Sequence, residues 1–214
     1  MRKTILATVA AAGLATVALG TLNAQGAPAP GAIDLAAVEA GDYTTDPSHS
    51  LVVWEVSHLG FNDYFGIFGD VEGTLSIDPA NVEGAALDVM IPVASVTVPS
   101  EGLKGHLLRP GKDGGAPDFF GPEPAAARFV STAVHSTGDT TAEIMGELTF
   151  NGVTNPVTIR AELSGMGTNA MSQKKTLGFH GTTTIKRSDW NLAWGIPFGI
   201  SDDVDLEISV AFEK

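Results

Sequence analysis

The sequence predicts an all-β domain, an antiparallel β-barrel of about eight strands with one long Gly/Pro-rich loop and little helix. Three observations support this prediction. Short segments of strand-like pattern recur through residues 43–213, and Gly, Pro, Asn or Asp bounds each of them. Almost no stretch of this region shows the apolar spacing of a helix. Several segments are longer than the strands of an average sandwich, which favours a barrel.

The chain begins with the order of features that is typical of a secretory signal peptide. Two basic residues precede an apolar run over residues 5–19, and small residues follow it. The run is rich in Ala, Gly and Thr, whereas an uncleaved anchor usually has about 20 more strongly apolar residues. We therefore expect a cleaved signal peptide at residues 1–24, a linker at residues 25–41 and the domain at residues 42–214. The protein is then exported, to a periplasm or to the extracellular medium.

The composition excludes several kinds of site and partner. The 214-residue chain contains no Cys, so disulfides, thiolate nucleophiles and Cys-bound metals are impossible. The formal net charge is −13, and it becomes −15 once the leader and its two basic residues are removed. Because so acidic a surface repels phosphate backbones, we expect no nucleic-acid partner.

Eight segments are expected to form the strands. Their approximate ranges are 51–58, 66–77, 85–98, 128–135, 141–150, 157–163, 176–187 and 204–212. In the first segment Val52, Trp54 and Val56 recur at every second position, which is typical of a strand with one apolar face. The pair Asn151-Gly152 lies between two segments and predicts a tight hairpin, because both residue types tolerate positive φ.

The stretch from Pro99 to Pro124 interrupts the strand pattern. Gly and Pro recur throughout it, so only a short helix around residues 103–108 is expected there. A loop of this length in a compact domain is usually a lid, a flap or a disordered insertion. We expect it to pack on an apolar surface because it carries Leu103, Leu107, Leu108, Phe119 and Phe120. Residues 33–40 could form a second short helix.

The sequence shows no recognisable catalytic or metal-binding signature. It lacks the GxSxG, HExxH, GxGxxG and P-loop motifs. A zinc or copper site needs several converging ligands, and the odd spacing of His49 and His58 would place them on opposite faces of a strand. Glu143 and Glu147 could share one strand face, but outward carboxylates in an acidic protein need no catalytic explanation. We therefore expect no enzyme activity, no metal and no cofactor.

Several short motifs follow one another along residues 43–213. They are Tyr43-x-x-Asp46-Pro47-x-His49-Ser50, Val52-x-Trp54-x-Val56-x-His58-Leu59-Gly60, Gly66-x-Phe68, Asp118-Phe119-Phe120, Phe129-x-Ser131-Thr132, Gly146-Glu147-Leu148-Thr149-x-x-Gly152-Val153-Thr154-x-Pro156-Val157, Gly178-Phe179 and Arg187-Ser188-Asp189-Trp190. In this order they resemble the YceI-like family. The resemblance implies a lipocalin-like barrel that is exported, is often a dimer, and holds a long isoprenoid chain or similar lipid.

The inward-facing side chains form either a packed core or a pocket, and the resemblance favours the pocket. The candidate ligand-binding residues are Val52, Trp54, Val56, Phe68, Leu75, Leu87, Val89, Phe129, Leu148, Phe179, Arg187 and Trp190. The ligand would be an isoprenoid or quinone-type lipid. Arg187 could bind its phosphate or quinone head group, or it could pair with Asp189 or another acid and stabilise a corner. Asp46 and His49 could likewise define a mouth or cap a turn.

The leading hypothesis is a non-catalytic exported carrier that binds a polyisoprenoid or similar long-chain lipid. One alternative is an enzyme that acts on a lipid-like substrate with His49, Asp46 or Arg187. Another is a structural or interaction module whose barrel is filled by its own side chains.

Overall fold

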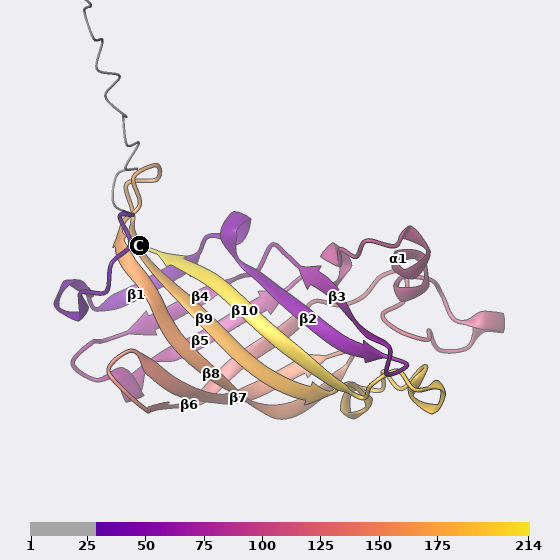
Figure 1. Ribbon diagram of the computed structural model, residues 1–214. Helices are drawn as coiled ribbons and strands as arrows, with labels where there is room; N and C mark the ends of the chain where they lie inside the picture. Colours follow the sequence, from indigo (N-terminus) through magenta and orange to yellow (C-terminus); the bar gives the residue numbers. More distant parts are fainter. Residues whose placement is uncertain (1–28) are drawn as a thin grey trace, which may run out of the picture.

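The structure, a computed structural model, describes residues 29–214. The predicted signal peptide lies outside this range. Ten antiparallel strands form one sheet that closes on itself where β1 pairs with β10 (Figure 1). The strands are β1 (Gly41–Thr45), β2 (Leu51–His58), β3 (Asn62–Phe68), β4 (Glu72–Ile77), β5 (Ala86–Ile91), β6 (Ala127–Ser136), β7 (Thr141–Phe150), β8 (Val153–Thr168), β9 (Lys175–Lys186) and β10 (Asp203–Glu213).

The ten strands occupy eight positions around the barrel. Strands β1 and β2 both pair with β10, one after the other, so together they form one kinked strand. Strand β4 pairs with β1 and β3 pairs with β2, so these two form the neighbouring position. Strands β5 to β9 follow in sequence order. The predicted antiparallel barrel of about eight strands is confirmed.

Several of the predicted strands differ from the observed ones, and β8 at Val153–Thr168 is much longer than the predicted segment 157–163. The segment 66–77 is broken between β3 and β4, where Asp70 takes a left-handed φ of 55° that a continuous strand does not allow. The segment 85–98 stops at Ile91, because Pro92 follows and has no N–H for the ladder. Strand β1 was not predicted, and it begins at the end of the predicted linker.

Helical structure is sparse, as predicted. The α-helix α1 spans Glu101–Leu107, close to the predicted range, and the Oγ of Ser100 accepts a hydrogen bond from the Leu103 amide at its N-terminus. The expected helix near residue 35 is a single 3-10 turn, Leu35–Ala37. Across residues 29–214, no helix combines the length and the apolar character needed to cross a membrane.

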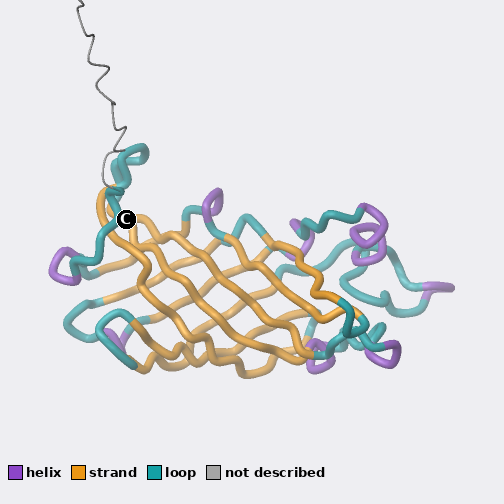
Figure 2. Tube along the Cα trace, in the orientation of Figure 1, coloured by secondary structure: helices purple, strands orange, loops and turns teal. Residues whose placement is uncertain are grey.

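The barrel has two different ends (Figure 1, Figure 2). The first, here called the tail end, carries β1, the C-terminus and the β8–β9 turn at residues 169–174. The second, here called the lid end, carries residues 99–124 with α1, which we name the lid, and the β9–β10 connection at residues 191–201. Apolar clusters run along the interior, and a separate cluster joins Val96 and Val98 to Leu107 of the lid.

Candidate functional site

The interior of the barrel is hollow. A cavity of about 570 Å³ lies inside it, lined by alternate side chains of the strands and by the lid. A second cavity of about 340 Å³ extends toward the tail end and adjoins the first, since Leu75, Leu87, Ile144, Ala161 and Phe179 line both. The larger cavity is within the range of about 300–1,000 Å³ that small-molecule pockets usually have.

Most of the predicted ligand-binding residues lie in the wall of this cavity. Eleven of the twelve line it, namely Val52, Trp54, Val56, Phe68, Leu75, Leu87, Val89, Phe129, Leu148, Phe179 and Arg187. Trp190 is the exception, because it does not line the cavity although it was predicted to bind the ligand. Its indole is buried behind the wall, and its Nε1 donates to the Leu148 carbonyl oxygen at 3.1 Å. Trp190 therefore ties the corner after β9 to β7 and does not face a ligand.

The chemistry of the wall suits a hydrocarbon. Among the described residues that line it, Arg187 and three His are the only groups that can carry charge near neutral pH, and there is no carboxylate. Most of the others are aliphatic or aromatic. Burial of apolar ligand surface against such a wall contributes about 25 cal/mol per Å². The cavity can therefore bind a long apolar chain without any specific chemistry along its length.

The lid closes one end of the cavity by packing. Leu103, Leu107, Phe119 and Phe120 line the cavity, which agrees with the expectation that this loop covers an apolar surface. The ring of Phe120 contacts those of Phe68 and Phe150 at centroid distances of 5.8 and 5.7 Å. These are packing contacts between aromatic rings, and no hydrogen bond between the lid and the strands accompanies them among the described residues.

A polar cluster lies on the same lid. The Nε2 of His106 and the Oδ2 of Asp118 are 2.9 Å apart, and Arg109 donates to the same carboxylate oxygen at 2.6 Å. The hydrogen bond from Arg109 holds the pKa of Asp118 below its usual value, and His106 adds to this effect. The ring of His106 also packs 4.4 Å from that of Trp194. The lid therefore meets the β9–β10 connection at the His106–Trp194 contact.

Arg187 is a structural anchor as well as a wall residue. Its guanidinium donates to the backbone carbonyls of four residues of the β9–β10 connection: Leu192, Trp194, Ile200 and Ser201. Burial lowers the pKa of this guanidinium, and the nearby Asp202 carboxylate opposes the shift. Within the described residues Arg187 forms no ion pair with Asp189 or another acid, so it stabilises the corner through carbonyl oxygens and not through a carboxylate. The guanidinium fixes residues 191–201 to the barrel.

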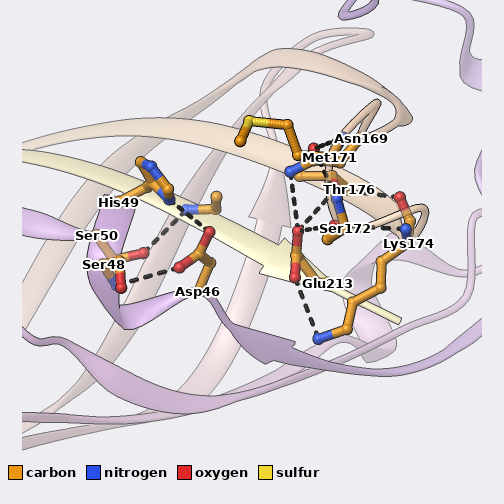
Figure 3. A network of polar contacts seen from close by, with 11 residues as sticks. Asp46, Ser48, His49, Ser50, Asn169, Met171, Ser172, Lys174, Thr176 and Glu213 are labelled. Atoms are coloured by element: carbon orange, nitrogen blue, oxygen red, sulfur yellow. Dashed lines mark hydrogen bonds and ion pairs between the residues drawn. The ribbon is translucent and has the colours of Figure 1, made fainter.

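Asp46 and His49 lie outside the cavity. Asp46 accepts a hydrogen bond from the Ser48 amide at 3.1 Å and contacts the Nδ1 of His49 at 2.6 Å (Figure 3). The His49 side chain is 76% exposed. Both residues thus shape the kink between β1 and β2, as the turn interpretation predicted. Within residues 29–214, no three carboxylate or imidazole side chains converge in a way that could hold a metal ion.

Comparison with known proteins agrees with this architecture. The YceI-like domain matches residues 43–212. The chain belongs to the YceI-like family. A UPF0312 protein of Pseudomonas fluorescens is 36% identical over 176 residues, which cover 81% of this chain and 86% of that protein. A UPF0312 protein of Pseudomonas putida is 35% identical over 174 residues, covering 80% and 85%.

Several solved structures have the same barrel. Burkholderia cenocepacia BcnA superposes with a TM-score of 0.62 at 25% identity, over 75% of this chain and 95% of that one. The Campylobacter jejuni YceI protein gives 0.60 at 29% identity, over 74% and 89%. A polyisoprenoid binding domain of Saccharophagus degradans gives 0.58 at 15% identity, over 82% and 99%, and this match shows the fold alone.

Several residues that line the cavity were not among the predicted ligand-binding residues. Tyr64 was missed because β3 begins at Asn62, earlier than its weak alternation indicates. His106 and Trp194 were missed because both lie in segments without strand alternation, where no period of two shows which way a side chain faces. Only the apolar content of residues 99–124 pointed to a contribution from the lid.

Proposed function

We propose that this protein is a non-catalytic carrier that binds a long-chain lipid, such as a polyisoprenoid, inside its barrel. The observation that carries the proposal is the hollow apolar interior beneath a packed lid. A barrel of about eight strands is either filled by its side chains or holds one small ligand. The adjoining cavities favour the second case over the filled-barrel alternative.

The energetics favour a long, flexible chain. Each CH₂ group that leaves water for the cavity contributes about 0.8 kcal/mol. The wall is apolar along its length, so affinity grows with the number of carbons that the cavity accommodates. The Saccharophagus degradans protein is described as polyisoprenoid binding, which supports the idea that this fold can hold such a chain.

Binding without catalysis is supported by where the candidate catalytic residues lie. Asp46 and His49 are absent from the described cavity wall. The guanidinium of Arg187 already donates hydrogen bonds to carbonyl oxygens of the β9–β10 connection. General acid–base or nucleophilic catalysis requires the groups to converge on the bound substrate. Following the leader-like N-terminus, we also propose that the carrier acts after export, in a periplasm or outside the cell.

The proposal is tested by a substitution that places a larger side chain in the cavity. Ala161 lies where the two cavities meet, and Ala161→Phe would occupy that space. The matched control is Ala133→Phe, at an exposed position of β6. Native mass spectrometry with organic extraction should find a prenyl or acyl lipid on the unaltered protein and on the control, and much less on Ala161→Phe. An unaltered protein that carries no lipid and takes none up would sink the proposal.

A further inference from the structure

Two hydrogen-bond donors of the cavity wall have no partner. The Nε1 of Trp54 and the Oη of Tyr64 are shielded from solvent, and neither contacts an acceptor in the part of the chain that the structure describes. Both side chains line the cavity. Buried polar groups are nearly always hydrogen-bonded, because desolvation without a partner is costly. The two orphaned donors therefore require an explanation.

The rest of the chain shows that this is a local feature. The other tyrosine, Tyr43, donates from its Oη to the Glu39 carbonyl oxygen at 2.8 Å. Trp190 donates to the Leu148 carbonyl, and the remaining tryptophan, Trp194, is partly exposed to water. Among the described Trp and Tyr side chains, the unmet donors are thus confined to the cavity wall beneath the lid.

The fold holds the two aromatic rings side by side on one face of β2 and β3. Trp54 pairs with Gly66 across β2 and β3, and Tyr64 is two residues from Gly66 on the same face. A Cβ at Gly66 would lie 2.1 Å from the indole Cζ2, so the absence of a side chain there lets the indole lie flat over β3. The indole and phenol rings stack at 6.4 Å with an interplanar angle of 29°.

The lid packs beside both rings. Trp54 and Tyr64 pack against the cluster of Val96, Val98 and Leu107, together with Leu103 and Phe119 of the lid. Lid side chains are held there by apolar contacts, so they can move aside at a smaller cost than a strand can. A ligand oxygen that reaches the two donors would satisfy groups that the closed lid leaves unsatisfied.

We propose that Trp54 Nε1 and Tyr64 Oη form the seat for a neutral oxygen acceptor, of the carbonyl class, in the head group of the bound lipid. Indole can only donate a hydrogen bond, so the ligand atom must accept one. Among the described wall residues, Arg187 is the one permanently charged group, and it already directs four hydrogen bonds at carbonyl oxygens, so a neutral head group fits the two donors better than an anionic one. The seat places the head beneath the lid and the chain toward the tail end.

This seat rests on the proposed carrier function and has its own test. The probes are a polyprenyl ketone, which has one carbonyl, a polyprenyl carboxylate and squalene, which has no oxygen. The variants Tyr64→Phe and Trp54→Phe remove the donors, and Tyr43→Phe and Trp190→Phe are matched controls. We expect each seat variant to weaken ketone binding about five- to tenfold, since a net hydrogen bond accounts for that factor. Squalene binding should weaken less than ketone binding in each seat variant, so the ratio of ketone affinity to squalene affinity should fall.

The thermal stability of the lipid-free variants shows whether the two side chains bind a ligand or only pack in the wall. Tyr64→Phe removes only an orphaned hydroxyl, so it should leave the melting temperature of the lipid-free protein unchanged or raised. Tyr43→Phe should lower the melting temperature, because the Glu39 carbonyl loses its donor. The proposed seat is overturned if the seat variants lose equal affinity for ketone and squalene. It is also overturned if the unaltered protein prefers the carboxylate or binds ketone and squalene equally well. These outcomes leave the proposed carrier function intact. If none of the three probes binds, both the proposed seat and the proposed carrier function are wrong.

Discussion

The two ends of the barrel are held together by different physical means. At the tail end, the carboxylate of Glu213 is almost fully buried and accepts hydrogen bonds from Asn169 at 3.1 Å and Ser172 at 2.8 Å (Figure 3). Lys174 adds an ion pair at 3.2 Å. The network fixes the β8–β9 turn onto the last residues of β10, beside the β1–β10 pairing that closes the sheet.

The lid end is divided into a fixed half and a loosely held half. Residues 191–201 are tied to the barrel by the four hydrogen bonds of Arg187. The lid is held mainly by aromatic and aliphatic contacts, and two donors beneath it find no acceptor among the described residues. Directional hydrogen bonds fix one geometry, whereas apolar contacts can be exchanged for contacts with a ligand. From this difference we expect a lipid to enter between the lid and the Arg187 anchor.

The largest expected effect comes from breaking the fixed half of the lid end. Arg187→Met would leave four carbonyl groups without their donor, which we expect to cost roughly 3 kcal/mol or more. The melting temperature should fall by about 6–12 °C. Arg187→Lys should fare little better, because an ammonium cannot reproduce the planar fork. A Lys variant as stable as the unaltered protein would show that charge alone suffices.

The next effect concerns the loosely held half. Phe120→Ala would remove the ring that contacts Phe68 and Phe150, with a cost of about 2–3 kcal/mol for a partly buried Phe. We expect bound lipid to leave faster, since the lid loses its main contact with the wall. Stopped-flow transfer of a fluorescent fatty ketone to acceptor vesicles measures this rate. The surface variant Phe198→Ala, at a 73% exposed position, should leave thermal stability unchanged.

A smaller effect should come from the tail end at acidic pH. Burial alone would raise the pKa of Glu213, but hydrogen bonds from Ser172 and Lys174 outweigh it and hold that pKa below the usual value of 4.5. The carboxylate therefore stabilises the fold above pH 4.5, and this contribution is lost as the pH falls through the lowered pKa. Glu213→Gln should cost about 1 kcal/mol at pH 7 and less at about pH 3. Urea midpoints at both values check the sign, and a loss that grows as the pH is lowered would contradict it.

The smallest effect needs no substitution. In hydrogen exchange of the lipid-free protein, the amides of Phe120 and Gly121, which share the Leu107 carbonyl, should exchange faster than those of β10 beside β9. Added lipid should slow exchange in the lid and leave β10 unchanged. Equal protection at both ends would remove the distinction between a fixed and a movable closure.

Much of the barrel follows from local sequence pattern. The alternation of Val52, Trp54 and Val56 correctly predicts the inward face of β2, because a strand places every second side chain on one face. The same reasoning places Leu148 and Phe179 in the wall. It does not hold for Trp190, which lies in a 3-10 turn where the period of two does not apply.

The sequence by itself determined the strand-rich barrel, its inward faces and the apolar character of the lid, because these depend on residue type and spacing along the chain. Only the tertiary structure decided that the interior is hollow, that Arg187 binds carbonyl oxygens and that Trp54 and Tyr64 lack acceptors within residues 29–214. Cavity volume is a small difference between enclosed space and side-chain volume, and hydrogen-bond partners come from residues far apart in sequence. Both are properties of how the strands close, and no local pattern encodes them.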